Sequence, residues 1–551
     1  MERPQFSRIS TKSTSLLPTD SNANVNSTTD ATTAVSYENI NSEIQSIRIG
    51  SPSIRSIETA SISSELNVSE ISNFATSVRR RVQASPHVAM NGGEPPTYLD
   101  LYPHCSSKTG GNLKEAEYFD RYVKISKSSD SIEFHDKLKH FFIFSTAGKP
   151  IYTMNGSDDL VMGYMGILTT ILYTFQEDLK QDLQIVELGD GLKLVAMNKA
   201  PIILVAISKL PHETDHLILG QLHVLYSYLL SILSKPAIDK YFHNRLNYDL
   251  RRILSALDLE NLDDLCTRLT YGWGDQAFAF YATQIFNSQQ SLRIPYTLRS
   301  KMDKILREFQ DDELLFSILA RDTVITNYIH AKPHNLPDAD LSLLLFIVSS
   351  LKNKNEDLWV PLCMPNFNKN GFLYVFSRSW NQLTIILISG SKNAFYKLKE
   401  IANAITTRAE QAQQGQFLSK FNHELAVPVS SLVPFVVKHF IYVNRDANCD
   451  ANRFIMSEYP QDNRDVVLQM GFYYNALLNC KSHLTAKKSL KNVEYKKLSY
   501  VKWGQVSGFM LSDTSYEFYC ITDDDVNSKK LIDISLAIVK WCKKNKSRLF
   551  T

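Results

Sequence analysis

The sequence predicts an α+β protein with three units, each an antiparallel sheet flanked by helices, behind a disordered N-terminal arm. Two observations support this prediction. First, the order strand, strand, helix, three strands, helix recurs three times without residue identity, and each copy describes one sheet whose faces helices can bury. Second, the composition changes near residue 136 from mostly small polar residues to runs of apolar residues. A chain of 551 residues, 44% of them hydrophobic, is long enough for several such domains.

Residues 1–135 form the predicted arm. Ser, Thr and Asn dominate this segment, and its apolar side chains are too few to offset the conformational entropy that folding would remove. We therefore expect the arm to be disordered.

The first unit is predicted over residues 136–257. Phe141–Phe144 is an unbroken apolar run, which is typical of a strand covered on both faces. Thr146–Pro150 predicts a hairpin turn, and Ser157–Asp159 predicts the start of a helix, because carboxylates are favourable near its positive end. The expected elements are strands at Phe141–Phe144, Ile151–Met154, Leu183–Leu188, Leu192–Asn198 and Ile202–Ser208, and helices at Ser157–Leu179 and Thr214–Leu233.

The second and third units are predicted over residues 311–425 and 426–551, after a helical connector at 258–310. The expected elements of the second unit are strands at Leu314–Leu319, Val324–Ile329, Trp359–Met364, Phe372–Arg378 and Leu383–Ser389, and helices at Pro337–Leu351 and Asn393–Gln411. Those of the third are strands at His439–Val443, Arg453–Glu458, Val493–Tyr500, Gln505–Leu511 and Glu517–Ile521, and helices at Asp462–Leu484 and up to Lys546.

The overall charge is nearly balanced, with 60 Lys and Arg against 57 Asp and Glu. A net charge of +3 argues against a surface built for nucleic acid, so no nucleic-acid partner is expected. Lysine clusters in the third unit predict a local, peripheral contact with an anionic phosphoinositide membrane. The lysines assigned to this contact are Lys487, Lys488, Lys491, Lys496, Lys497, Lys543, Lys544 and Lys546.

One motif suggests zinc chemistry. The stretch from His212 to His216 has the form H-E-x-x-H, in which two histidines one helical turn apart bind zinc and Glu213 activates water. A zinc metalloprotease is therefore a possible interpretation. The context disfavours it, because Pro211 precedes the motif and Thr214 or Asp215 is the expected helix N-cap, which leaves His212 outside the helix.

Other catalytic signatures are not found in the sequence. It contains no glycine-rich phosphate loop and no Gly-x-Ser-x-Gly elbow, and its thirteen histidines are scattered. We therefore expect no enzyme, no catalytic residues, no cofactor and no metal site. Seven cysteines without a Cys-x-x-Cys pair, and first residues without an apolar signal-peptide core, favour a cytoplasmic protein.

Four stretches carry a resemblance to a known family. Lys139–Tyr152, followed by Gly156–Asp159, resembles the opening of the MON/SAND family of vacuolar fusion proteins. The likeness continues in Leu314–Ala320, in Trp359–Pro365 with Phe367–Leu373, and in the C-terminal Arg548–Phe550. It covers about residues 136–551, more loosely over 258–310. The resemblance implies three longin domains, whose element order is the one predicted above.

The resemblance also implies a function. Proteins of this family pair with a Ccz-type longin subunit, and the heterodimer acts as a guanine-nucleotide exchange factor for the Rab GTPase of late endosomes and vacuoles. Such a complex promotes endosome maturation, vacuole fusion and autophagosome fusion. We expect a cytoplasmic protein recruited peripherally to late endosome, multivesicular body and vacuole membranes. The alternative is a non-catalytic longin scaffold or adaptor in vesicle trafficking.

Candidate GTPase-binding residues follow from the resemblance, which places the GTPase platform on the first longin domain together with its partner. The candidates occupy the first hairpin and the start of the following helix. They are Lys149, Tyr152, Asn155, Ser157, Asp158, Tyr164 and Met165. Each could instead be a core or capping residue.

Overall fold

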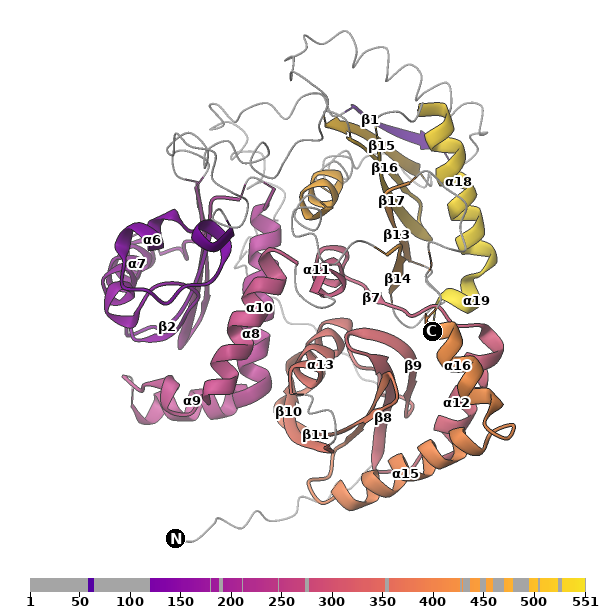
Figure 1. The fold of residues 1–551 in the computed structure, drawn as a ribbon. Helices are drawn as coiled ribbons and strands as arrows, with labels where there is room; N and C mark the ends of the chain where they lie inside the picture. Colours follow the sequence, from indigo (N-terminus) through magenta and orange to yellow (C-terminus); the bar gives the residue numbers. More distant parts are fainter. Residues whose placement is uncertain are drawn as a thin grey trace, which may run out of the picture. The chain divides into compact units, whose positions relative to one another are not determined.

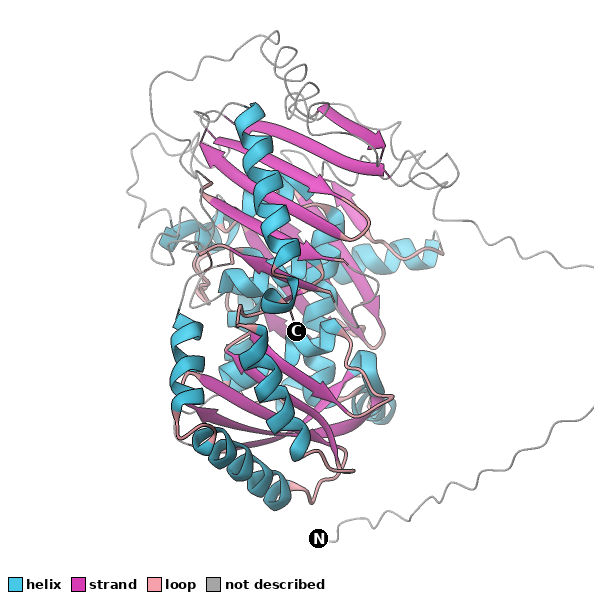
Figure 2. Cartoon of the chain, turned by 90° about the vertical axis from the view of Figure 1, so that its right-hand side faces the viewer, coloured by secondary structure: helices cyan, strands magenta, loops and turns pink. Residues whose placement is uncertain are grey.

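The computed structural model describes residues 58–63 and 119–550 apart from internal gaps, the longest of which are 430–436, 459–469 and 479–494. Three sheets, each with helices packed on it, make up this part of the chain (Figures 1 and 2). The rest of the predicted arm, including residues 1–57 and 64–118, lies outside the described residues.

Ordered structure begins before the predicted boundary at residue 135. A short helix, η2 (Phe119–Val123), and the helix α6 (Ser131–Asp136) precede the first strand. Val123 and Phe134 are buried, and the Leu138 backbone N–H donates to the Tyr122 carbonyl at 3.0 Å. These apolar side chains help to cover the first sheet, so residues 119–135 belong to the first domain and not to a disordered arm.

The first sheet has the order β3-β2-β6-β5-β4, and all its strand pairs are antiparallel. Its elements are β2 (Lys139–Ser145), β3 (Pro150–Thr153), α7 (Asp158–Asp178), β4 (Ile185–Glu187), β5 (Lys193–Lys199), β6 (Ile202–Ser208) and α8 (Asp215–Leu233). Strand β2 is buried on both faces: Phe142 and Phe144 pack beneath α7, whereas Phe141 and Ile143 pack toward α8. The predicted order of elements is confirmed here.

The second sheet has the equivalent order β10-β11-β12-β8-β9. Its elements are β8 (Leu314–Arg321), β9 (Val324–His330), α13 (Asp338–Ser350), β10 (Leu358–Met364), α14 (Pro365–Asn368), β11 (Lys369–Trp380), β12 (Leu383–Ser389), α15 (Phe395–Gln411) and α16 (Gln416–Ala426). Helix α13 covers one face and α15 the other. The short helix α14 and the helix α16 were not predicted.

Helix α8 is shared by the first two domains. It contacts β5 and β6 of the first sheet and β10 of the second, so one hydrophobic cluster runs through both domains (Figure 1). The rings of Tyr228 in α8 and Phe346 in α13 meet edge to face at 6.2 Å. Among the described helices, α8 alone is long and apolar enough to cross a membrane by length and composition. Its packing between two sheets accounts for that composition, because a helix buried on several sides is apolar all round.

The third sheet has seven strands in the order β1-β15-β16-β17-β13-β14-β7. Its own elements are β13 (His439–Asn444), β14 (Arg453–Met456), a helical segment at 470–478, β15 (Tyr495–Trp503), β16 (Val506–Ser512), β17 (Tyr516–Asp523), α18 (Ser528–Lys544) and α19 (Lys546–Leu549). Helix α18 packs along one face, which Figure 2 views from the helix side. The predicted helix at Asp462–Leu484 is described only over 470–478.

Both outer strands of the third sheet come from elsewhere in the chain. Strand β1 (Glu58–Ser63) lies within the predicted arm and pairs antiparallel with β15. Strand β7 (Gln289–Gln290) lies within the predicted helical connector and pairs parallel with β14. The expectations of a wholly disordered arm and a wholly helical connector are therefore corrected at these two places.

The connector is part of the domain cores. After α9 (Lys235–Asn244) it contains α10 (Ala256–Thr270), α11 (Ala277–Phe286), β7 and α12 (Tyr296–Glu308). Helix α11 fills the face of the third sheet opposite α18, where the Phe286 and Tyr519 rings lie 4.9 Å apart. Helix α12 packs into the second domain instead. Because α11 also donates from Gln284 Nε2 to Ser342 Oγ at 2.9 Å, it links the second and third domains.

Candidate functional site

A buried charged network occupies the position of the H-E-x-x-H motif. Lys139, at the start of β2, donates from Nζ to Glu213 Oε2 at 2.5 Å and to Gln221 Oε1 of α8 at 3.0 Å. Ser208 Oγ, at the end of β6, also donates to Glu213 Oε2. The Lys139 and Glu213 side chains are completely buried. The network therefore ties β2, β6 and α8 together inside the first domain.

The electrostatics of this network suit a structural role. Burial alone would raise the pKa of Glu213, but the charge and hydrogen bond of Lys139, together with His212 and the Ser208 hydroxyl, outweigh that effect and hold the pKa below its usual value. Glu213 is thus an ionised carboxylate whose two oxygens already accept hydrogen bonds from Lys139, Ser208 and Gln221. A general base in a zinc protease needs a free carboxylate facing a water molecule, and this arrangement does not offer one.

The two histidines of the motif do not face each other on one helix. Thr214 is the N-cap of α8, and its Oγ1 accepts a hydrogen bond from the Leu217 N–H at 3.2 Å, as predicted. His212 precedes the helix and is buried, which lowers its pKa to about 4, whereas His216 is exposed on the first turn of the helix. Within the described part of the chain, no group of three His, Cys, Asp or Glu side chains is placed to hold a metal ion.

Three of the seven candidate GTPase-binding residues are buried. Tyr152 donates from Oη to Asp263 Oδ1 at 2.6 Å, and Asn155 donates from Nδ2 to the Lys139 carbonyl at 2.9 Å. Met165 is fully buried among the apolar side chains between α7 and the sheet. None of the three reaches the surface of this chain on its own, and their contacts hold the hairpin and α7 in place.

Two further candidates are partly exposed but engaged locally. The Tyr164 ring stacks on Phe134 with centroids 5.1 Å apart, and its hydroxyl lies 2.8 Å from His135 Nε2. Ser157 accepts a hydrogen bond from Ser129 Oγ at 2.9 Å. These contacts fasten α6 and the segment before it to the start of α7.

Lys149 and Asp158 are the two candidates whose side chains are largely exposed. Lys149 is exposed in the hairpin turn between β2 and β3, next to Gly148, whose φ of +74° favours glycine. Asp158 is exposed at the first residue of α7 and forms an ion pair with Arg251 at 2.6 Å. The turn beside Lys149 faces Thr169, about three helical turns along α7 from Asp158, so the structure exposes a cation and an anion at two separate places beside this helix.

The outward face of α7 carries exposed apolar side chains that the sequence reasoning missed. Four large residues, between 40% and 59% exposed, lie on this helix; they are Met162, Ile167, Ile171 and Tyr173. Gly163 and Gly166 lie among them with open space above their Cα atoms. Large exposed apolar patches on soluble proteins mark interaction surfaces. We call this set of six residues the α7 face.

A sequence signal for the α7 face exists. Apolar residues occur on every side of α7, and a helix that is apolar all round is covered on both sides. The hydroxyls of Thr170 and Thr174, which lie among the exposed residues, donate to the carbonyls of Gly166 and Thr170 four residues earlier. Because these hydroxyls are already paired within the helix, the surface has little polar character.

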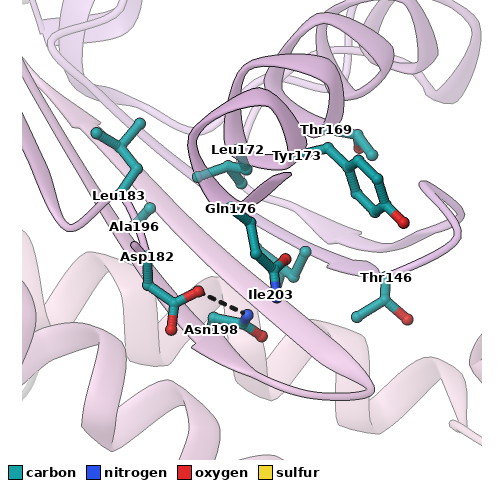
Figure 3. Close-up of a pocket in the computed structure, with 10 residues that line it drawn as sticks. All are labelled: Thr146, Thr169, Leu172, Tyr173, Gln176, Asp182, Leu183, Ala196, Asn198 and Ile203. Carbon is teal, nitrogen blue, oxygen red and sulfur yellow. Dashed lines mark hydrogen bonds between the residues drawn. The ribbon is translucent and has the colours of Figure 1, made fainter. Parts of the chain in front are cut away.

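A small cavity of about 50 Å³ lies beside the α7 face, between α7 and the sheet (Figure 3). Leu172 and Tyr173 of α7 line it together with Ala196 and Ile203 of the sheet. Its polar side includes Asn198, whose Nδ2 donates to Asp182 Oδ1 at 3.3 Å. A space this small and largely apolar suits one inserted side chain better than a substrate.

The predicted lipid-binding lysines are only partly described. Lys487, Lys488 and Lys491 lie outside the described residues, and Lys496 and Lys497 are described by backbone alone, in β15. The end of α18 and the start of α19 bring the remaining three together. Lys543 Nζ lies 4.1 Å from the centre of the Tyr516 ring, Lys544 is exposed, and Lys546 begins α19. Cations near a helix C-terminus are also favourable without any ligand.

Comparisons with known proteins agree with the fold. Profiles of the first, second and third longin domains of FUZ, MON1 and HPS1 match residues 139–265, 312–407 and 436–546. Over the full length of both chains, the sequence is 46% identical to a protein of Candida albicans named vacuolar fusion protein MON1. Proteins of the same name from Yarrowia lipolytica and Saccharomyces cerevisiae are 31% and 27% identical, over 78% and 82% of this chain and 78% of each relative. The predicted fold of three longin domains is thereby confirmed.

Proposed function

Because this chain belongs to the family of the vacuolar fusion protein MON1, we propose that it acts in vacuole fusion as one subunit of a guanine-nucleotide exchange factor. Its partner subunit is a Ccz-type longin protein, and its substrate is the Rab GTPase of the late endosome and vacuole. The complex serves endosome maturation, vacuole fusion and autophagosome fusion from the cytoplasmic side of those membranes.

The α7 face is the observation that supports the partner assignment. Its apolar side chains lie on the outer layer of the first domain, where nothing in the described part of the chain covers them. Strand β4, at the edge of the same sheet, carries the exposed Ile185 and pairs within the described chain with β5 alone. A longin partner offers a helix and a sheet edge of its own, so it matches both features.

The exchange reaction requires binding and no covalent step. A GTPase that holds GDP at picomolar strength has about 16 kcal/mol of affinity, and linkage requires the factor and the nucleotide to weaken each other's binding equally. The factor must therefore bind the GTPase with its nucleotide contacts opened. Lys149, exposed in the turn that faces Thr169 of α7, and Asp158, exposed at the first residue of α7, are the residues of this chain that we assign to the GTPase contact.

Buried residues keep that contact region rigid. Asn155 accepts from the Ser126 N–H at 3.2 Å and donates to the Lys139 carbonyl, so it joins the segment before α6 to β2. Tyr152 joins β3 to α10 through Asp263. A surface held in one geometry loses less conformational entropy when a partner binds.

The test is nucleotide release. The purified complex of this chain with its Ccz-type partner should speed the release of fluorescent GDP from the cognate Rab, and charge reversal by Lys149→Glu with Asp158→Lys should slow that release while the complex stays intact. A release rate equal to that of the Rab with free nucleotide alone would refute the proposal. The scaffold alternative predicts Rab binding of the same strength with GDP, with GTP and without nucleotide.

A further inference from the structure

Strand β1 lies along the outer strand of the third sheet. Its six residues pair with β15 from Glu58 opposite Tyr500 to Ser63 opposite Tyr495 (Figure 1). In each of the first two domains the strand equivalent to β15 forms the end of the sheet, at β4 and at β10. The third sheet differs, because a segment more than 400 residues away in sequence extends it.

The register places small residues of β1 opposite buried residues of β15. Residues directly opposite each other in an antiparallel pair share a face of the sheet. Ala60 is opposite Leu498, which is buried in the cluster beneath α18, and Thr59 is opposite Ser499, which is fully buried on the other face. The Ser499 hydroxyl has no hydrogen-bond partner within the described chain.

An open edge strand is a site for pairing with another chain. The opposite edge of the third sheet, at β14, is closed by β7. Strand β15 has nine residues, and β1 pairs with the first six of them, Tyr495–Tyr500. With β1 in place, both edges of the third sheet are covered by segments of the same chain.

We propose that the β15 edge is a peptide-docking site and that residues 58–63 are its intramolecular ligand. Residues 64–118 connect β1 to η2. A covalent connection of this length makes the pairing intramolecular, which gives the segment a higher effective concentration at the edge of its own sheet than a separate peptide would have. The assignment does not depend on the proposed exchange activity, so either can fail without the other.

The test removes the backbone donors of β1. In an edge pair, alternate N–H groups point toward the neighbouring strand, so one of residues 60 and 61 donates to β15. The double substitution Ala60→Pro with Ser61→Pro removes that donor, whichever of the two residues carries it. The matched control is Ala31→Pro with Thr32→Pro, which places the same two prolines in the arm outside β1. Hydrogen exchange followed by mass spectrometry on the full chain, in complex with its partner subunit, reads the amides of residues 498–500.

We expect these amides to exchange about tenfold faster or more in the β1 variant, with wild-type rates in the control and in β16 and β17. Unchanged exchange at 498–500 in the β1 variant would overturn the proposal. A synthetic peptide of residues 57–64 should restore protection to the variant in trans, and failure at millimolar peptide would also count against the site. If wild-type protection fell on dilution, β1 would come from a second copy, and the intramolecular assignment would be wrong.

Discussion

Lys139 Nζ lies 2.5 Å from Glu213 Oε2, and neither side chain is exposed to solvent. Removing one member of a buried ion pair leaves the other charge unpaired, at a cost of about 3–5 kcal/mol. We therefore expect Lys139→Met or Glu213→Gln alone to destabilise the first domain strongly. Lys139→Met should have the larger effect, because it leaves the Glu213 carboxylate buried without a cation. Urea unfolding of the purified chain, followed by tryptophan fluorescence and circular dichroism, measures the effect.

The double variant Lys139→Met with Glu213→Leu supplies the control for this pair. Two apolar side chains of similar length leave no buried charge. The double variant should therefore lose clearly less free energy of unfolding than the two single variants lose together. Additive losses would mean that the two groups act independently despite their contact.

The α7 face gives a prediction on partner binding. Ile167 is 59% exposed, so Ile167→Asp should leave the folding stability within about 0.5 kcal/mol of wild type. At a hydrophobic interface the same change should cost about 2 kcal/mol or more, which is about thirtyfold in affinity for the Ccz-type subunit. Tyr296→Asp is the matched control, because Tyr296 is 58% exposed at the start of α12. Equal affinities for the two variants in calorimetry would exclude the α7 face as the docking surface.

His140 makes stability depend on pH. Its ring is buried next to Phe134, with centroids 4.3 Å apart, and burial lowers its pKa to about 3. In the unfolded chain a histidine takes up a proton near pH 6.5, whereas the folded His140 stays neutral. The unfolded state therefore binds more protons below pH 6.5, and this residue should lower the free energy of unfolding by about 2 kcal/mol between pH 7 and pH 5.

The variant His140→Leu should remove that part of the pH dependence. Its urea midpoint should fall less between pH 7 and pH 5 than that of wild type. Identical slopes for wild type and His140→Leu would show that His140 does not contribute.

The lysines at the C-terminal end predict membrane binding. Replacing Lys543, Lys544 and Lys546 by Ala should weaken binding to phosphatidylcholine vesicles that contain phosphatidylinositol phosphate, by about tenfold or more, since each lysine near an anionic surface contributes about 1 kcal/mol. The control replaces Lys301, Lys369 and Lys392 by Ala, which removes the same charge from exposed positions of the second domain. Equal loss in both variants in vesicle flotation would mean that net charge alone matters.

Local patterns were sufficient to predict most of the fold. The apolar run of β2, the cap at Thr214 and the alternation in later strands depend on neighbours in sequence, and the three sheets follow the predicted order. Strands β1 and β7 could not be predicted in this way. Each is short, and its place is set by pairing with β15 or β14, which are distant in sequence.

The exposure of the candidate site residues could not be predicted from the sequence, because it depends on the whole fold. Tyr152 and Asn155 are polar enough for a binding surface, but Asp263 of α10 and the β2 backbone occupy their polar atoms. The apolar pattern of α7 indicated two covered sides, yet only the fold shows which residues remain exposed. Ile167 and Tyr173 are thus better candidates than Met165 for direct contact with a protein.

Helix α8 belongs to two sheets at once, and this constrains how the protein can be divided or altered. A chain cut after residue 257 would keep the first sheet but leave the side of α8 that meets β10 without its cover. Substitutions along α8 must satisfy both neighbours, so a change tolerated by one sheet can be rejected by the other. A single longin domain is therefore not a separable unit of this protein, because each of the first two domains completes the burial of α8.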